Sequence, residues 1–307
     1  MIDILLSTYN GEKYLPDQIE SLLSQTFTDW RLLIRDDGSN DSTIQYIETL
    51  EKKYPDKIVF IKDDRGNLGP SQSFSCLLKS SSAPYVAFCD QDDIWFSNKL
   101  ELQTKEMLLQ EEKLGKDVPI LIHSDLMVVD QNMKVLSASF WKYQKLNPEK
   151  MNNIETLLVQ NYVTGCTCLL NRKLIDIAVP IRKDAIMHDW WLAIIAVSNG
   201  SIIDISEPTI YYRQHNSNDV GAKAWGVTYI YELVFKSFSS IRTALLNTRN
   251  QAAALQRIEC LKEPNRNLIK RYVSLYEMGW FERHKEVFKL GLRKYGFIRN
   301  MAFLFLL

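Results

Sequence analysis

Residues 85–95 read YVAFCDQDDIW, an apolar run of five residues that ends in three carboxylates within four positions. An apolar run followed directly by Asp90, Asp92 and Asp93 is typical of a buried strand whose end opens onto a ligand site. Carboxylates this close repel one another, and a divalent cation that takes hard oxygen ligands, Mg²⁺ or Mn²⁺, would offset the repulsion. The stretch therefore predicts a site for a metal and a diphosphate. A solvated acidic loop is the alternative that these residues alone leave open.

Around this stretch, the first 100 residues alternate strand-like and helix-like patterns. Strands are expected at residues 2–7, 30–35, 58–62 and 85–89, and helices at 15–23, 44–54 and 67–80. Such alternation predicts an α/β fold with a mostly parallel central sheet flanked by helices, and ligands beyond the carboxyl ends of its strands. Shorter strand-like pieces follow at 120–123, 126–129, 167–170, 202–205 and 209–212, and the pattern beyond 225 is helical.

Charge is distributed unevenly along the chain. Its 307 residues carry 37 Lys/Arg and 37 Asp/Glu, but residues 223–307 hold 15 Lys/Arg against 6 Glu and no Asp. The resulting +9 on this segment, against −9 on residues 1–222, favours an anionic partner. We expect no nucleic acid, because no recognised binding module accompanies the charge. The 5 cysteines show no disulfide framework, which favours free thiols in a reducing cytoplasm. Neither a signal peptide nor a spanning helix is expected.

Two more polar stretches follow strands of the expected sheet: STYNG at residues 7–11 and DDGS at 36–39. Both would lie at the same sheet edge as Asp90. An aromatic ring and a carboxylate there suit a nucleobase, since Tyr9 can stack on it and Asp37 can accept its imide N–H. A buried tyrosine and a type I turn are the alternatives for each stretch taken alone.

Four motifs taken together resemble family 2 glycosyltransferases: LSTYNG at residues 6–11, RDDGS at 35–39, NLG at 67–69 and DQDD at 90–93. The resemblance implies a GT-A fold with a catalytic domain over residues 1–222, divided into a nucleotide-binding half (1–100) and an acceptor-binding half (101–222). A helical extension over 223–307 would follow. The implied ligand contacts are Ser7, Tyr9, Asp37, Asn67 and Asp90 for the nucleotide, and Asp92 for Mg²⁺ or Mn²⁺.

The motif HDWW at residues 188–191 matches the place where this family carries its catalytic base, here Asp189. Inverting transfer needs a carboxylate that takes the proton of the acceptor hydroxyl as its oxygen attacks the anomeric carbon. Asp189 is also a candidate N-cap of the helix that follows, a role compatible with the first. The usual pattern has Glu-Asp, so His188 departs from it.

A further motif, YYRQHN at residues 211–216, follows an expected strand. The resemblance implies that His215 approaches the metal or diphosphate and that Arg213 helps to neutralise the diphosphate. The residue types fit, because a neutral imidazole can ligate a metal and a guanidinium can bind phosphate with two hydrogen bonds. A single histidine without these neighbours is more commonly a surface or packed residue.

Taken together, the motifs look most like the rhamnosyltransferase branch of the family, in particular the streptococcal type that extends rhamnose-rich cell-wall polysaccharides on a lipid carrier. That likeness implies dTDP-β-L-rhamnose as donor, a lipid-diphosphate-linked saccharide as acceptor and an α-rhamnoside as product. A UDP-sugar donor is the alternative. On the acceptor side we expect Thr164 and Gly165, within residues 161–165, and Trp190.

The basic extension ends in an expected amphipathic helix. Lysines and an arginine recur at positions 285, 289 and 293, facing an apolar stripe at 288, 292, 295 and 298. This pattern favours attachment to the anionic inner face of the cell membrane, as a peripheral cytoplasmic enzyme. Packing on the main domain or in a homo-oligomer is the alternative.

Other functions fit the sequence less well. A nucleotidyltransferase would release pyrophosphate, and no Gly-rich phosphate loop supports one. A non-catalytic sugar- or lipid-binding partner subunit should lack Asp92 or Asp189, and both are present. A glycosidase needs two carboxylates flanking the scissile bond, which no motif here places together.

Overall fold

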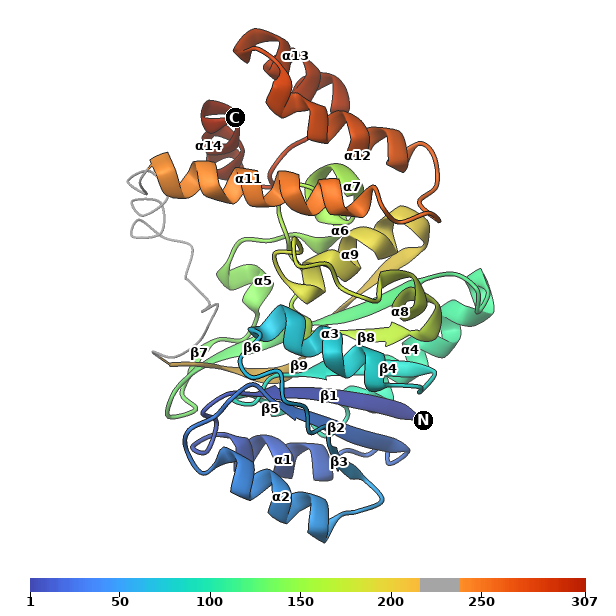
Figure 1. Ribbon diagram of the computed structural model, residues 1–307, viewed down its shortest axis with the longest axis vertical. Coiled ribbons are helices and arrows are strands. Elements are labelled where there is room, and N and C mark those ends of the chain that lie inside the picture. The colour runs from blue at the N-terminus through green and yellow to red at the C-terminus, as the bar shows by residue number, and fades with distance from the viewer. Residues whose placement is uncertain (216–237) are drawn as a thin grey trace.

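The computed structural model describes residues 1–215 and 238–307. In these ranges a mixed β-sheet carries helices on both faces. The C-terminal helices form a further layer, outside the helices that cover one face of the sheet (Figure 1). The boundary predicted between residues 222 and 223 lies outside the described residues.

The sheet has a parallel half and a mixed half. Its strands are β1 (Ile2–Thr8), β2 (Trp30–Asp36), β3 (Ile58–Phe60), β4 (Tyr85–Cys89), β5 (Ile94–Trp95), β6 (Ile120–Asp130), β7 (Val135–Ser137), β8 (Leu169–Asn171) and β9 (Ser201–Gln214). The order is β3-β2-β1-β4-β8-β6-β9-β5, with β7 paired to β6. Strands β3, β2, β1 and β4 run parallel, β8 is antiparallel to both its neighbours, and β6 and β9 are again parallel.

Helices cover both faces because the strands are apolar on both sides. Along β1, Ile2, Ile4 and Leu6 belong to one hydrophobic core, and Leu5 belongs to the other. The helices of the main body are α1 (Leu15–Leu23), α2 (Thr43–Lys53), α3 (Pro70–Ser80), α4 (Lys99–Leu114), α5 (Phe140–Tyr143), α6 (Pro148–Met151), α7 (Ile154–Leu157), α8 (Arg172–Ala178) and α9 (His188–Asn199). Short 3₁₀ turn η1 (Gly165–Thr167) precedes β8.

Several expected elements differ in extent. The pieces expected at 120–123 and 126–129 form the single strand β6, whose pairing with β9 shifts register at Ser124 and Asp125. Likewise, 202–205 and 209–212 are parts of β9. Helix α3 begins at Pro70 rather than at residue 67, because Gly69 has a φ of 76° and Pro70 is suited to a first helical turn.

The C-terminal helices are α11 (Phe238–Leu255), α12 (Asn265–Ser274), α13 (Trp280–Leu290) and α14 (Phe297–Leu306), with the 3₁₀ turn η2 (Leu275–Glu277) before α13. They share a core with the main body, since Leu245, Ile269 and Phe303 belong to the same cluster as Trp191. No helix within the described ranges combines the length and apolar character needed to cross a bilayer.

The single amphipathic helix expected around residues 285–298 is wrong. Helix α13 ends at Leu290 because Gly291 takes a left-handed conformation (φ 69°), and Gly296 (φ 89°) separates the chain from α14. The expected apolar stripe is therefore split: Phe288 is 70% exposed, whereas Leu292 is buried.

Candidate active site

A cavity of about 970 Å³ opens at the carboxyl ends of β1, β2 and β4, between the sheet, α9 and the C-terminal helices. Of the 12 residues predicted for the site, it is lined by Ser7, Tyr9, Asp37, Asn67, Asp90, Asp92, Thr164, Gly165, Asp189 and Trp190. The strand register explains the convergence at one edge, because Ser7 pairs with Arg35 on β2 and Leu6 pairs with Cys89 on β4. The predicted roles of these residues stay predictions.

The side chain of Gln91 joins the ends of β1 and β4. It accepts a hydrogen bond from the Tyr9 amide and donates one to the Tyr9 carbonyl, both at 2.9 Å. Gly11 makes room for it, since a Cβ on Gly11 would lie 2.2 Å from Oε1 of Gln91. Tyr9 itself is held by its backbone and is 47% exposed beside the cavity, which leaves it accessible for the predicted stacking on a base. Nothing in the sequence indicates these two hydrogen bonds between Gln91 and the Tyr9 backbone.

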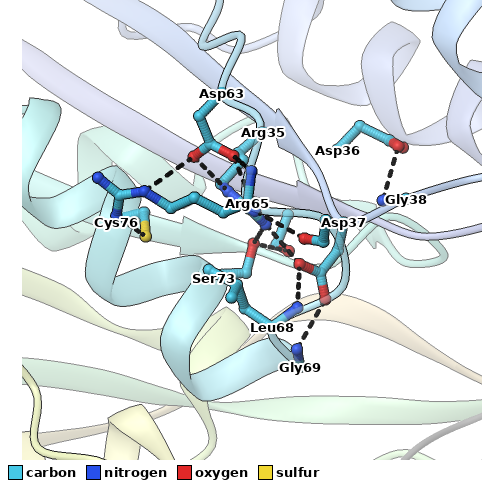
Figure 2. Close-up of polar contacts among 12 residues, drawn as sticks. Arg35, Asp36, Asp37, Gly38, Asp63, Arg65, Leu68, Gly69, Ser73 and Cys76 are labelled. Atoms are coloured by element: carbon cyan, nitrogen blue, oxygen red, sulfur yellow. Dashed lines mark hydrogen bonds and ion pairs between the residues drawn. The ribbon is translucent and has the colours of Figure 1, made fainter.

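A buried arginine organises the end of β2. Arg35, only 1% exposed, donates from Nη1 to Asp37 at 2.5 Å and from Nε to Asp63 at 3.0 Å (Figure 2). Burial opposes its charge, but hydrogen bonds to Asp63 and Asp37 outweigh burial and raise the pKa of Arg35. The hydrogen bond from Arg35 is also the main reason that the pKa of Asp63 is lowered.

Asp37 in turn holds the loop that precedes α3 through hydrogen bonds. Its two carboxylate oxygens accept the backbone N–H groups of Leu68 and Gly69, both at 2.8 Å (Figure 2). Asn67, one of the expected nucleotide contacts, therefore lies on a loop fixed by Asp37. An imide N–H would have to share a carboxylate that already accepts these bonds, so the base contact predicted for Asp37 stays a prediction.

The acidic loop meets the end of β9. Nε2 of His215 lies 2.8 Å from Oδ2 of Asp92, and its ring stacks on Tyr14 with centroids 4.7 Å apart. The Arg213 guanidinium lies over the same Tyr14 ring at 4.6 Å and donates to Asp17 at 2.9 Å. The structure thus brings the two predicted metal ligands together. Asp92 lines the cavity, whereas His215 and Arg213 are not among its lining residues, and Arg213 is buried against Tyr14 and Asp17.

Donor atoms at this edge fit a hard divalent cation. Asp90 and Asp92 line the cavity with carboxylate oxygens, and His215 adds an imidazole nitrogen beside Asp92. Ligand atoms of Asp90, Asp93 and Cys166 also lie within 4.8 Å of one another. Asp93, however, is fully buried, and burial together with Asp92 and Asp90 raises its pKa well above the usual value. The cation site predicted at Asp92 and His215 stays a prediction.

Asp189 lies across the cavity, in the first turn of α9. Met187 is the N-cap, so the expectation that Asp189 caps the helix is wrong: it is the second helical residue. Its Oδ2 accepts the Gly165 amide at 3.0 Å and its Oδ1 accepts the Trp190 amide at 2.5 Å. Burial outweighs these hydrogen bonds and raises the pKa of Asp189 to about 6. A carboxylate with this pKa is ionised at neutral pH and still basic enough to take a proton.

His188 packs beneath Asp189, between two phenylalanine rings. Its ring centroid lies 4.2 Å from that of Phe74 and 4.7 Å from that of Phe88. Burial lowers its pKa to about 3, so the imidazole is neutral. Among the described residues neither of its ring nitrogens has a hydrogen-bond partner, although the side chain lines the cavity. Gly165 fits against it, since a Cβ there would lie 2.7 Å from Nε2 of His188.

One wall of the cavity is formed by elements that the sequence did not assign to the site. Trp190 is anchored through Nε1 to the carbonyl of Leu157 at 2.6 Å. The C-terminal region also contributes to the cavity wall, through Leu245 and Thr248 of α11, Lys294 of the segment before α14, and Arg299, Phe303 and Leu306 of α14. No motif marks these positions, because their place depends on how distant helices pack.

Solved structures share this architecture. Staphylococcus aureus TarS 1–349 in complex with UDP-GlcNAc aligns with a TM-score of 0.57 at 18% identity, covering 94% of this chain and 79% of that one. The mannosyltransferase PcManGT from Pyrobaculum calidifontis, in complex with GDP-Man and Mn²⁺, aligns with a TM-score of 0.53 at 12% identity, covering 94% and 72%. The shared architecture is the GT-A fold, which confirms the predicted fold class.

The family follows from the sequence comparison. The model "Glycosyl transferase family 2" matches residues 3–176, and the chain belongs to that family. The dTDP-rhamnosyl transferase RfbG of Shigella flexneri is 26% identical, over 71% of this chain and 74% of its own. The enzyme WfgD of Escherichia coli, named as a UDP-Glc:alpha-D-GlcNAc-diphosphoundecaprenol beta-1,3-glucosyltransferase, is 29% identical over 71% and 79%. An uncharacterized glycosyltransferase of Nostoc sp. is 28% identical over 71% of this chain and 66% of its own length.

Proposed function

We propose that this chain is an inverting, divalent-metal-dependent glycosyltransferase that moves L-rhamnose from dTDP-β-L-rhamnose to a lipid-diphosphate-linked saccharide. The observation that carries the proposal is the arrangement of one cavity: a nucleotide edge with the acidic loop on one side, and a buried carboxylate with a pKa of about 6 on the other. The rhamnose donor is supported by the likeness to RfbG, and the lipid-linked acceptor by the likeness to WfgD.

In this mechanism the acceptor hydroxyl lies beside Asp189 and loses its proton to that carboxylate as its oxygen attacks the anomeric carbon. The new glycosidic bond forms on the face opposite the bond to the diphosphate, which breaks and releases the nucleoside diphosphate. The Gly165 and Trp190 amides hold the Asp189 carboxylate in place before the proton arrives. A divalent cation held by Asp92 and His215 would neutralise the charge that develops on the leaving diphosphate.

Tyr9, Ser7 and Asn67 bind the nucleotide in this proposal. Gln91 fixes the backbone of Tyr9, and Asp37 with Arg35 fixes the loop that carries Asn67. Thr164, Gly165 and Trp190 border the acceptor. Because the acceptor is lipid-linked, we place the enzyme on the inner face of the cell membrane as a peripheral protein.

The test is a donor screen for nucleoside diphosphate release with a polyprenyl-diphosphate-linked saccharide as acceptor. Release from dTDP-rhamnose that needs acceptor and metal, and that is lost in Asp189→Asn and Asp92→Asn, is the expected result. The likeness to WfgD makes UDP-glucose the second candidate donor. Activity with UDP-glucose alone would overturn the rhamnose assignment and keep the mechanism. Nucleotide binding without nucleoside diphosphate release from any donor would overturn the proposal that the chain is an enzyme.

A further inference from the structure

Exposed aromatic side chains gather on the last two helices. Trp280, Phe281, Phe288, Phe297 and Phe305 are 59–82% exposed, whereas every other large apolar side chain of the described ranges is at most 52% exposed. A phenylalanine or tryptophan buries roughly 150–250 Å² when it is fully covered, so five of them at this exposure leave several hundred Å² of aromatic surface in water. Met301, at 50%, lies among them. We call these six side chains the aromatic face.

Spacing places them on one side of each helix. Phe297, Met301 and Phe305 recur every four residues along α14, and Phe281 and Phe288 are seven residues apart on α13. Nε2 of His284 lies 2.7 Å from the Leu304 carbonyl, and Arg283 bonds the Leu307 carbonyl. These contacts tie the start of α13 to the end of α14.

The surroundings of the aromatic face are cationic. Lys285 and Lys289 are exposed on α13 close to Phe281 and Phe288, and Arg293 is exposed in the segment that follows. Residues 280–307 carry 6 Lys/Arg against 2 Glu. Aromatic rings flanked by lysines are the composition of surfaces that enter the headgroup region of an anionic membrane, where the rings insert and the ammonium groups stay with the phosphates.

The position of α14 links this surface to the catalytic cavity. Its opposite side contributes Ala302, Phe303 and Leu306 to the wall of the cavity that holds Asp189. In Figure 1, α13 lies beyond α11, at the end of the molecule remote from α1 and α2. Helix α14 thus borders the cavity on one side and presents Phe297 and Phe305 to the outside on the other.

We propose that the aromatic face docks on an anionic lipid monolayer, with α14 holding the acceptor side of the cavity at the headgroup level. The inference rests on the proposed function in one respect, the lipid-linked acceptor. Such an acceptor could then reach Asp189 with its saccharide while its lipid stays in the membrane. The occupant is a lipid surface rather than a second copy of the chain, because clustered cations beside the rings would repel the same cations of a copy.

The test is co-sedimentation of the full chain with two kinds of vesicle. One contains phosphatidylcholine alone, and the other also contains about 30% of the anionic lipid phosphatidylglycerol, which gives the vesicle a negative surface potential. Phe281→Ser/Phe305→Ser should lower the partition coefficient on anionic vesicles about a hundredfold, at about tenfold for each buried ring. Lys285→Gln/Lys289→Gln should lower it about tenfold or more on these vesicles only. The matched control is Leu108→Ser/Val135→Ser, at 52% and 51% exposure elsewhere on the surface, and should bind like wild type.

Equal melting temperatures would show that the variants fold. Wild-type protein that stays in the supernatant, or a Phe281→Ser/Phe305→Ser variant that binds as wild type does, overturns the proposal. So does a wild-type dimer that this variant dissociates without any vesicle binding, which would make the face a self-interface. Activity on a water-soluble short-chain diphosphate acceptor should be unchanged in the variant. Vesicle binding is measured without donor or acceptor. Its result therefore tests the docking proposal even if the proposed glycosyl transfer is wrong.

Discussion

The pKa of Asp189 makes a quantitative prediction about pH. A buried carboxyl with a pKa of about 6 is roughly 90% ionised at pH 7 and roughly 10% ionised at pH 5. Because only the ionised form can take the acceptor proton, kcat should fall about tenfold between these pH values, with a midpoint near 6. The assay is initial-rate release of nucleoside diphosphate at saturating donor and acceptor, with nucleotide binding measured at each pH.

The Asp189→Asn variant supplies the control. It should lose about 10²–10⁴ in kcat, the usual contribution of a general base, and bind nucleotide as wild type does. Its residual kcat should not fall as the pH is lowered through 6. A wild-type kcat that does not change from pH 5 to 8, or an Asp189→Asn variant whose kcat still falls below pH 6, would refute the assignment of Asp189 as the base.

The same pKa predicts a trend in stability. The folded state raises the pKa of Asp189 from 3.8 to about 6, so its favourable contribution is full below pH 3.8 and is lost as the pH rises through 6. The shift of about 2 units corresponds to about 3 kcal/mol. The free energy of unfolding of Asp189→Asn, relative to wild type, should therefore rise by up to about 3 kcal/mol from pH 4 to pH 8. Urea denaturation across this range measures it, and a difference independent of pH would contradict the burial argument.

Three further predictions concern the frame of the site. Gly165→Ala should lower stability by about 1–3 kcal/mol and reduce kcat, because its Cβ would press on His188; thermal melting and rates measured well below the melting temperature check this. Arg35→Met should cost about 3–5 kcal/mol in urea denaturation and weaken nucleotide binding, whereas Lys62→Met, which breaks an exposed ion pair, should leave both unchanged; equal effects would contradict the role of burial. EDTA should abolish activity and Mn²⁺ restore it in wild type but not in Asp92→Asn, and an EDTA-resistant rate would remove the metal from the proposal.

The convergence of the nucleotide edge was predictable because it depends on strand order and strand ends. Ser7 lies near the end of a strand with a readable apolar pattern, and Tyr9, Asp37 and Asp90 each follow one; parallel neighbours bring the carboxyl ends of these strands together. The motif at residues 188–191 predicts Asp189 as the base, which stays a prediction, and the helix start was misplaced because Met187, with no capping side chain, is the N-cap.

The rest depended on contacts that leave no local signal. Gln91 occupies the unspecified position of its motif, and only the folded structure shows that it bonds to Tyr9, 82 residues away. The cavity wall from α14 depends on helix packing across more than 100 residues. At Gly291 and Gly296 the helical period persists in the sequence while the backbone turns, so the apolar pattern alone predicted one helix where there are two.

The anomeric configuration of the product tests the central claim most directly. The product made from the identified donor would be isolated and its one-bond carbon–proton coupling at the anomeric centre measured by NMR. A single displacement assisted by Asp189 predicts inversion, which from dTDP-β-L-rhamnose gives an α-linked rhamnoside. A product with retained configuration would contradict the account, because a single displacement on the face opposite the leaving diphosphate inverts the anomeric carbon.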